Sequence, residues 1–212
     1  MVVNKAPGEI VQGDKTGDEP LVETLKRHIK ERDAKPGNVF LGVVHRLDRP
    51  VGGVVVFAKT SKALTRLNEM LRRGEIHKTY WAITRNMPPL PEDMLTHYIT
   101  TVERTNKSTA YAAPCPNAKE ARLRYRLINS SDRYHLLEVE LITGRKHQIR
   151  VQLSAIGCPI RGDLKYGDKR SNPDGSISLL ARNIRFEHPV SHKMIDVTAP
   201  VPDDNLWKAL EV

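Results

Sequence analysis

The fold of this chain is decided by residues 44–59, which read VHRLDRPVGGVVVFAK. The second half of this stretch is an uninterrupted apolar run with three consecutive valines, a pattern typical of a buried β-strand. Pro50 and the pair Gly52–Gly53 stand before that run and predict a tight loop that leads into the strand. The stretch therefore predicts a loop that is held in place by a buried strand.

Asp48 lies in that loop among side chains that carry or can acquire a positive charge: His45, Arg46 and Arg49. A loop at the end of a buried strand is fixed by the scaffold and still open to substrate, so Asp48 is a candidate for chemistry. The alternative is structural, with Asp48 as a turn residue paired with Arg46 or Arg49. The residues of the loop by themselves leave both interpretations open.

Length and composition indicate a globular protein with one large domain or two small ones, since the chain has 212 residues. Hydrophobic residues make up 39% of it, which is enough for a core at this size. The formal net charge is +9 and the pI about 9.6, which favours a polyanionic partner such as nucleic acid. A basic chain that is merely soluble is the other interpretation of this charge.

Cysteine and histidine usage argues against disulfide frameworks and metal sites. Cys115 and Cys158 each stand alone, without a Cys-x-x-Cys pair. His188 and His192 are separated by Pro189 and have no cysteine or acidic cluster nearby, so we expect no metal there. No signal peptide is visible and no apolar run approaches the roughly 18 residues of a membrane helix, so the expected location is the cytoplasm, without membrane association.

Periodicity predicts many strands and few helices, and therefore an α+β fold with a mostly antiparallel mixed sheet and flanking helices. A helix is expected over residues 18–32, and a second begins at Thr60 or Ser61 and stops before Gly74. Further helices are expected over residues 143–156 and 206–210. The expected strands cover residues 1–4, 39–44, 54–58, 75–85, 94–113, 121–129, 134–143, 177–186 and 194–199.

We expect residues 1–212 to form a single domain, in which the Pro-rich connector near residues 87–92 could divide two sub-lobes. One of the expected strands carries arginine at alternate positions, namely Arg122, Arg124 and Arg126. Such a strand presents a basic outer face. That face is either simply solvated or a track for RNA.

Three motifs, in order along the chain, resemble those of the RluA-type family of RNA pseudouridine synthases. The first is His45-Arg46-Leu47-Asp48, and the second is Lys78-x-Tyr80. The third is the run TGRKHQIR over residues 143–150, with Gly157, Pro159, Gly162, Asp163 and Tyr166-Gly167 behind it. The chain departs from the family at Val51-Gly52-Gly53, where a Thr-Ser-Gly-like triplet is usual, and its first strand is short.

The resemblance implies a pseudouridine-synthase-like catalytic domain with a central active-site cleft. The accessory RNA-binding domain that many members of the family carry is not expected in this sequence. Its activity would be isomerisation of specific uridines in structured rRNA or tRNA to pseudouridine. The reaction breaks and remakes a glycosidic bond without redox change, so neither a cofactor nor a metal is expected. By resemblance the catalytic residues are Asp48, Tyr80 and Arg150: a carboxylate, an aromatic ring that stacks on the uracil, and a guanidinium that orients the carboxylate.

The resemblance also implies a set of substrate-binding residues, namely Arg46, Lys78, Arg145, His147 and Gln148. Arg46 would fill the gap left when the target base is turned out of the RNA stack. For His45 and His147 we favour structural hydrogen bonds over acid–base roles. The expected partner is an RNA stem-loop, bound by a monomer that needs no obligate protein partner.

The rival hypothesis is a non-catalytic RNA-binding or RNA-folding module on the same scaffold. It is motivated by the altered triplet at residues 51–53, by the short first strand and by the expected lack of the accessory domain. Against it, Asp48, Tyr80 and Arg150 are all present, and a pure binder has no need of that trio. A carbohydrate hydrolase fits less well, because no second carboxylate lies near Asp48 in the sequence and the chain is basic.

Overall fold

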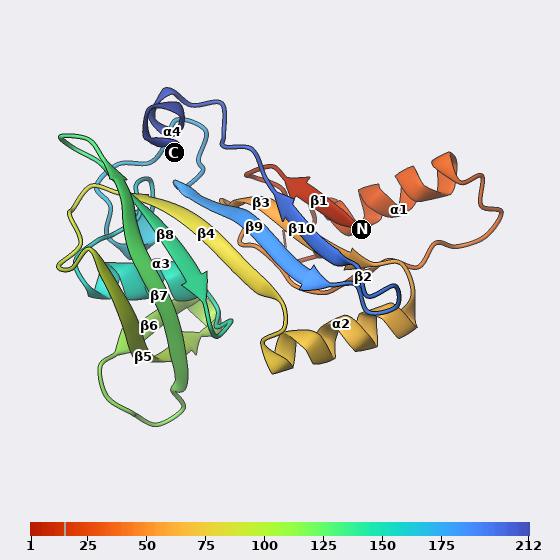
Figure 1. Ribbon diagram of the computed structural model, residues 1–212, viewed down its shortest axis with the longest axis horizontal. Coiled ribbons are helices and arrows are strands. Elements are labelled where there is room, and N and C mark those ends of the chain that lie inside the picture. The colour runs from red at the N-terminus through yellow and green to blue at the C-terminus, as the bar shows by residue number, and fades with distance from the viewer. Residues whose placement is uncertain (15) are drawn as a thin grey trace. The chain divides into compact units, whose positions relative to one another are not determined.

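The computed structural model describes residues 1–14 and 16–212. The chain forms two compact units (Figure 1). Unit 1 comprises Met1–His77 and Asn183–Ala199, and unit 2 comprises Lys78–Arg182 and Pro200–Val212. Each unit is therefore assembled from two separate segments of the chain.

Unit 1 is built around β3 (Gly52–Ala58), the strand expected from the valine run. All seven of its residues are buried. Two strands pair antiparallel with it, namely β1 (Val2–Lys5), which places Lys5 opposite Gly53, and β2 (Gly42–Val43). The apolar run from 39 was expected to be a longer strand, but only Gly42 and Val43 of it form the strand β2. Unit 1 also contains β10 (Met194–Thr198), antiparallel to β9 (Leu179–Glu187).

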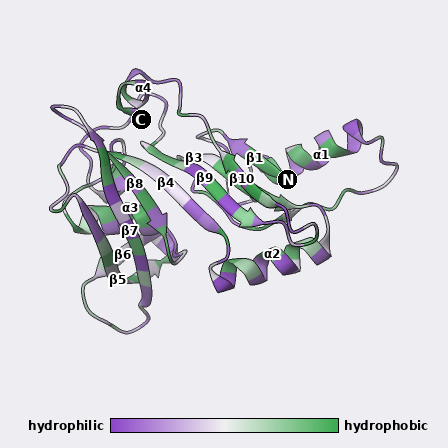
Figure 2. Ribbon diagram, viewed as in Figure 1, coloured by the Kyte–Doolittle hydropathy of each residue, from purple (hydrophilic) through white to green (hydrophobic). Residues whose placement is uncertain are grey.

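Two helices belong to unit 1. The first, α1 (Leu21–Arg32), starts after Pro20 rather than at Asp18, and buries Ile29 completely. The second, α2 (Ser61–Arg73), has polar and apolar faces (Figure 2) and packs on β2 and β3. The Oγ1 of Thr60 accepts a hydrogen bond from the amide of Ala63 at 3.1 Å, and Gly74 ends the helix with a φ of 73°.

Unit 2 contains an antiparallel sheet with the strand order β4-β8-β7-β5-β6. These strands are β4 (His77–Thr84), β5 (Glu92–Val102), β6 (Lys107–Tyr111), β7 (Lys119–Ser130) and β8 (His135–Leu141). Residues 94–113 were expected to form one strand, and this expectation was wrong. They form the hairpin of β5 and β6. The chain reverses direction through a 3-10 turn (Glu103–Thr105) and Asn106, which has a φ of 49° in the left-handed region.

A helix covers part of this sheet. It is α3 (Gln148–Ala155), and Val151 from it packs with Ile99, Ala121 and Tyr166 in a buried cluster. The helix starts at Gln148 rather than at the expected residue 143, because residues 143–147 form a loop. Unit 2 also holds a 3-10 turn (Leu164–Tyr166) and α4 (Asn205–Leu210), which is capped by Asp204.

The Pro-rich connector near residues 87–92 lies inside unit 2 and is not the boundary between the units. The reason is that its backbone is fastened to the sheet: Pro91 O accepts from the amide of Leu127 at 2.7 Å, and Leu90 O accepts from the Tyr125 hydroxyl at 3.2 Å. The α+β class with a mostly antiparallel mixed sheet is confirmed. Within the described residues no helix is both long and apolar enough to cross a bilayer.

Candidate active site

Asp48 lies in unit 1, in the turn that leads into β3. The amide of Val51 donates to the backbone oxygen of Asp48 at 3.0 Å, which closes a turn through Arg49 and Pro50. Asp48 is half-buried. The turn therefore fixes the backbone of this carboxylate at the end of a buried strand without sealing the residue in hydrocarbon.

The glycine pair after this turn has a steric reason. A Cβ at Gly52 would lie 3.2 Å from Cδ of Pro7 and 3.3 Å from the backbone oxygen of Lys5. Gly53 has a φ of 114°, which side chains rarely adopt. The departure from the family's usual triplet at residues 51–53 thus accompanies close packing of the N-terminal segment on the Asp48 loop.

Lys5 fastens that N-terminal segment to the loop. Its residue exposure is only 1%, and its Nζ donates to the backbone oxygens of Ala6 at 2.8 Å, Glu9 at 2.8 Å and Arg49 at 3.2 Å. Burial lowers the pKa of Lys5 to about 8, although the negative charges of Glu9 and Asp48 act against the shift. The amide of Gly8 also donates to Arg49 O, at 2.8 Å.

The basic residues next to Asp48 in the sequence, Arg49, His45 and Arg46, have separate surroundings. Arg49 donates to Thr16 Oγ1 at 2.9 Å and forms an ion pair with Asp18. His45 Nε2 accepts from the amide of Val56 at 3.2 Å, a structural hydrogen bond as expected. Arg46 is exposed, and its side chain makes no hydrogen bond or ion pair within the part of the chain that the structure describes.

Lys78 and Tyr80 lie in unit 2, near the start of β4. Tyr80 is 6% exposed and stands opposite Val139 of β8. Lys78 is half-buried, and burial lowers its pKa. Trp81 is also 6% exposed, and the Arg182 guanidinium carbon lies 4.3 Å from its ring centroid.

Arg150 is the most tightly held of the predicted site residues. Its Nε and Nη2 donate to the two carboxylate oxygens of Asp163 at 2.7 and 2.9 Å. The Arg150 side chain is 7% exposed and that of Asp163 is 1% exposed. Its guanidinium carbon lies 4.9 Å from the ring centroid of Tyr166. A bidentate pair over an aromatic ring fixes the plane of the guanidinium.

Tyr166 also holds the residue before α3. Its hydroxyl accepts from the amide of Ser108 at 2.9 Å and shares a hydrogen bond of 2.7 Å with Nδ1 of His147. Burial raises the pKa of the Tyr166 hydroxyl. This contact is a hydrogen bond of the kind favoured for His147, and both its structural and its substrate-binding role stay predictions.

Gln148 organises the loop before α3. Its Oε1 accepts from Thr143 Oγ1 at 2.8 Å and from the amide of Arg145 at 2.9 Å, and its Nε2 donates to Arg122 O at 3.0 Å. The residue is 3% exposed. Arg145 is exposed and uses its Nε to donate to Glu120 O at 2.8 Å. The side-chain amide of Gln148 thus stabilises the loop through hydrogen bonds, whereas the Arg145 side chain lies at the surface of the loop.

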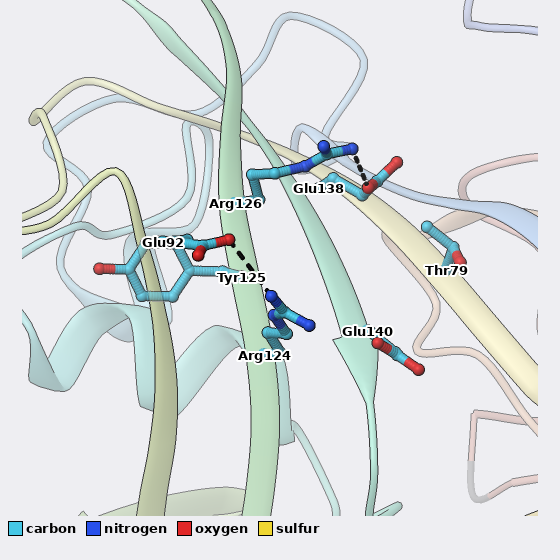
Figure 3. Close-up of a pocket in the computed structure, with 7 residues that line it drawn as sticks. All are labelled: Thr79, Glu92, Arg124, Tyr125, Arg126, Glu138 and Glu140. Carbon is cyan, nitrogen blue, oxygen red and sulfur yellow. Dashed lines mark hydrogen bonds and ion pairs between the residues drawn. The ribbon is translucent and has the colours of Figure 1, made fainter.

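The basic strand is β7, and acidic side chains surround its arginines. Arg124 pairs with Glu92 at 3.3 Å, and Arg126 pairs with Glu138 at 3.0 Å. Figure 3 shows both pairs in a hollow of about 230 Å³. The lining consists of Thr79, Glu92, Arg124, Tyr125, Arg126, Glu138 and Glu140. Three carboxylates face two guanidinium groups there, and Arg122 pairs with Glu120 at 3.2 Å, which favours the solvated-face interpretation over the RNA track.

The predicted site residues fall into two groups. Asp48 and Arg46 belong to unit 1, and the others belong to unit 2: Lys78, Tyr80, Arg145, His147, Gln148 and Arg150. That Asp48 acts together with Tyr80 and Arg150 in one active site therefore stays a prediction.

Lys5 and Asp163 are two supporting residues that the sequence did not assign. Asp163 stands in the third motif, but nothing in the sequence identified its partner. No group of three or more potential metal ligands occurs among the described residues.

Comparison with known proteins gives the family. The profile of the RNA pseudouridylate synthase family matches residues 1–155. The chain belongs to this family. The RluA-type resemblance of its motifs is therefore confirmed.

Relatives of this pseudouridylate synthase family member align along nearly all of it. An uncharacterized RNA pseudouridine synthase of Chloroflexus aurantiacus is 35% identical over 96% of the chain and 61% of the relative. The ribosomal large subunit pseudouridine synthase C of Vibrio cholerae is 29% identical over 95% of the chain and 62% of the relative. The chain thus spans about three fifths of the length of these relatives.

A solved structure has the same fold. Human RNA pseudouridylate synthase domain containing 4 superposes with a TM-score of 0.80 and 26% sequence identity. The match covers 95% of this chain and 85% of the human one. The family's fold is thus present over nearly the whole chain.

Proposed function

We propose that this protein is an isomerase that converts specific uridines of structured RNA to pseudouridine, with Asp48 as its catalytic carboxylate. The observation that carries the proposal is the setting of Asp48, in a family member, on a half-buried turn at the end of a fully buried strand. The reaction breaks the bond from C1′ to N1 and forms a bond from C1′ to C5. A proton leaves C5, and N1 gains one.

The three catalytic residues have complementary tasks in this proposal. The ionised Asp48 stabilises positive charge at the ribose or forms a covalent adduct, the two roles that carboxylates take in glycosidic chemistry. Tyr80 stacks on the uracil while it turns over and assists removal of the C5 proton. Arg150, with its plane fixed by Asp163, orients the carboxylate through charge-assisted hydrogen bonds.

The substrate is RNA whose target base is turned out of the stack, at a cost of a few kcal/mol. Arg46 supports this step, since its exposed side chain makes no hydrogen bond or ion pair within the described residues and can enter the gap. Relatives are named for the large ribosomal subunit, so rRNA is the first substrate to test and tRNA the second.

The decisive experiment compares the wild-type protein with Asp48→Asn on total cellular RNA, with pseudouridine measured by nucleoside mass spectrometry. We expect wild-type turnover, and a loss of at least about 1,000-fold in the variant, because a carboxamide cannot replace an ionised carboxylate in either role. RNA affinity should be retained. Turnover that survives in Asp48→Asn would remove Asp48 from the mechanism. RNA binding without turnover in the wild type would favour the non-catalytic module.

A further inference from the structure

Lys78 is a cation that has no counter-charge among the described residues. It is half-buried near the start of β4, and its ammonium makes no hydrogen bond or ion pair within the part of the chain that the structure describes. Burial lowers its pKa. No carboxylate of the described chain lies within ion-pair distance of it. Removing an ammonium from water without a partner is unfavourable, and a folded protein usually avoids it.

Other cations of unit 2 have the carboxylate partner that Lys78 lacks within the described residues. Lys146 pairs with Glu103 at 3.0 Å, although both are at the surface. Arg150, which is more deeply buried, has the carboxylate of Asp163. Among the buried and half-buried lysines and arginines of unit 2, Lys78 is therefore the one that has no carboxylate partner within the described residues. Its Nζ reaches solvent, because Gln152 Oε1 is the one fully buried side-chain polar atom without a hydrogen bond in the described chain.

The loop before α3 brings the backbone of Gly144 close to this ammonium. A Cβ built on Gly144 would lie 3.9 Å from the Nζ of Lys78, so the bare backbone of Gly144 lies next to the charge. The amides of Thr143 and Arg145 donate to Arg122 O and Gln148 Oε1, at 3.1 and 2.9 Å. The Gly144 amide donates to no described residue.

We propose that Lys78 and the backbone of Gly144 form a binding site for one phosphodiester group of the RNA substrate. The site provides a positive point charge and an unused N–H, the two elements that bind phosphate oxygens in proteins. A glycine at position 144 keeps the approach open, because any side chain there would stand against the ammonium. The identity of the phosphate as RNA rests on the proposed function, but the anion site itself does not.

The first test reads the Lys78 ammonium directly. Protein labelled with ¹³C at the lysine ε-carbons is titrated with pH, first alone and then with inorganic phosphate or the trinucleotide UpUpU. We expect the pKa of Lys78 to rise when either anion is bound, because a phosphate favours the charged form. The Lys78→Met variant assigns the resonance. If the Lys78 resonance responds to neither anion, the proposed phosphate site is wrong and Lys78 is only a solvated ammonium.

The second test measures the salt dependence of RNA binding. Lys78→Met should weaken binding of an RNA stem-loop about tenfold and reduce the slope of log K against log salt by about 1. Gly144→Ala should fold normally, because the φ of Gly144 is ordinary and the added methyl group meets no clash. It should still weaken RNA binding, because the methyl group would stand beside the Lys78 ammonium. The matched control is Lys119→Met, which removes an exposed lysine of the same unit and should leave the slope unchanged.

The outcomes separate this site from the proposed activity. An unchanged salt slope in Lys78→Met overturns the phosphate contact even if the enzyme forms pseudouridine. A Lys78 resonance that responds to phosphate in a protein that forms no pseudouridine contradicts the proposed function and supports the anion site. A merely structural lysine would change stability but not the salt slope.

Discussion

Lys5 and Lys78 are two lysines withdrawn from solvent that differ in the hydrogen-bond acceptors around their ammonium groups. Lys5 in unit 1 is 1% exposed and gives its ammonium to three backbone oxygens. Lys78 in unit 2 is half-buried and has no partner in the described chain. The Lys5 ammonium holds the Asp48 loop, and the Lys78 ammonium stays available to bind an anion. The difference shows that a lowered lysine pKa does not by itself distinguish a structural lysine from a binding one; the acceptors around it do.

The largest effect is expected at a third buried cation, Arg150, whose counter-charge is a carboxylate. Asp163→Asn leaves the guanidinium without its anion and should lower the free energy of unfolding by about 3–5 kcal/mol. The control is Glu138→Gln, which breaks the exposed pair with Arg126 and should cost less than about 1 kcal/mol. Urea denaturation measures both. Equal losses in the two variants would show that burial does not set the strength of these pairs.

A smaller effect is expected from pH at Lys5. Its pKa is about 8 in the folded protein against 10.5 ordinarily. Between these values the unfolded chain binds more protons than the folded one, so stability should rise with pH. The expected gain from pH 8 to pH 10 is about 2–3 kcal/mol relative to Lys5→Met, which lacks the titrating group. Parallel stability curves for the two proteins would mean that Lys5 is not desolvated.

The smallest effect is expected for Lys78→Met without RNA. Because its ammonium contacts no acceptor in the described chain, its removal breaks no interaction there. The variant should lower the free energy of unfolding by less than about 0.5 kcal/mol, or raise it. Thermal unfolding at neutral pH measures this. A loss as large as that of Asp163→Asn would assign Lys78 a structural role and remove the contrast with Lys5.

Regular elements of this fold were predictable where local chemistry decides them. The helix α2 has a threonine cap at Thr60 and a left-handed glycine at Gly74, and both signals are readable in the sequence. The valine run of β3 was equally clear, because a strand buried on both faces carries no polar alternation. The three motifs led to the family, and the comparisons confirmed it.

Other features depend on contacts that the sequence does not show. Residues 143–147 have a helix-like pattern, but the Gln148 amide binds Thr143 and Arg145 and holds them as a loop, with His147 at a φ of 55°. The β5–β6 hairpin lacks a Gly or Pro signal and turns at Asn106 instead.

The supporting residues were missed for the same reason. Lys5 and Arg49 are 44 positions apart, and only the folded chain brings the ammonium of the first to the carbonyl of the second. Arg150 and Asp163 are 13 positions apart and belong to one motif, yet no helical or strand spacing links them. Sequence patterns identify a candidate carboxylate or guanidinium, whereas the groups that orient it emerge from tertiary packing.

The discontinuity of both units bears on how the protein can be made and divided. The strand β9 runs from one unit into the other, with residues 179–182 in unit 2 and residues 183–187 in unit 1. During synthesis β1 and β3 therefore leave the ribosome long before β10, which completes their unit. A fragment that stops at His77 lacks β9 and β10, so truncation alone does not isolate unit 1. Its two segments would have to be joined by a linker in place of residues 78–182.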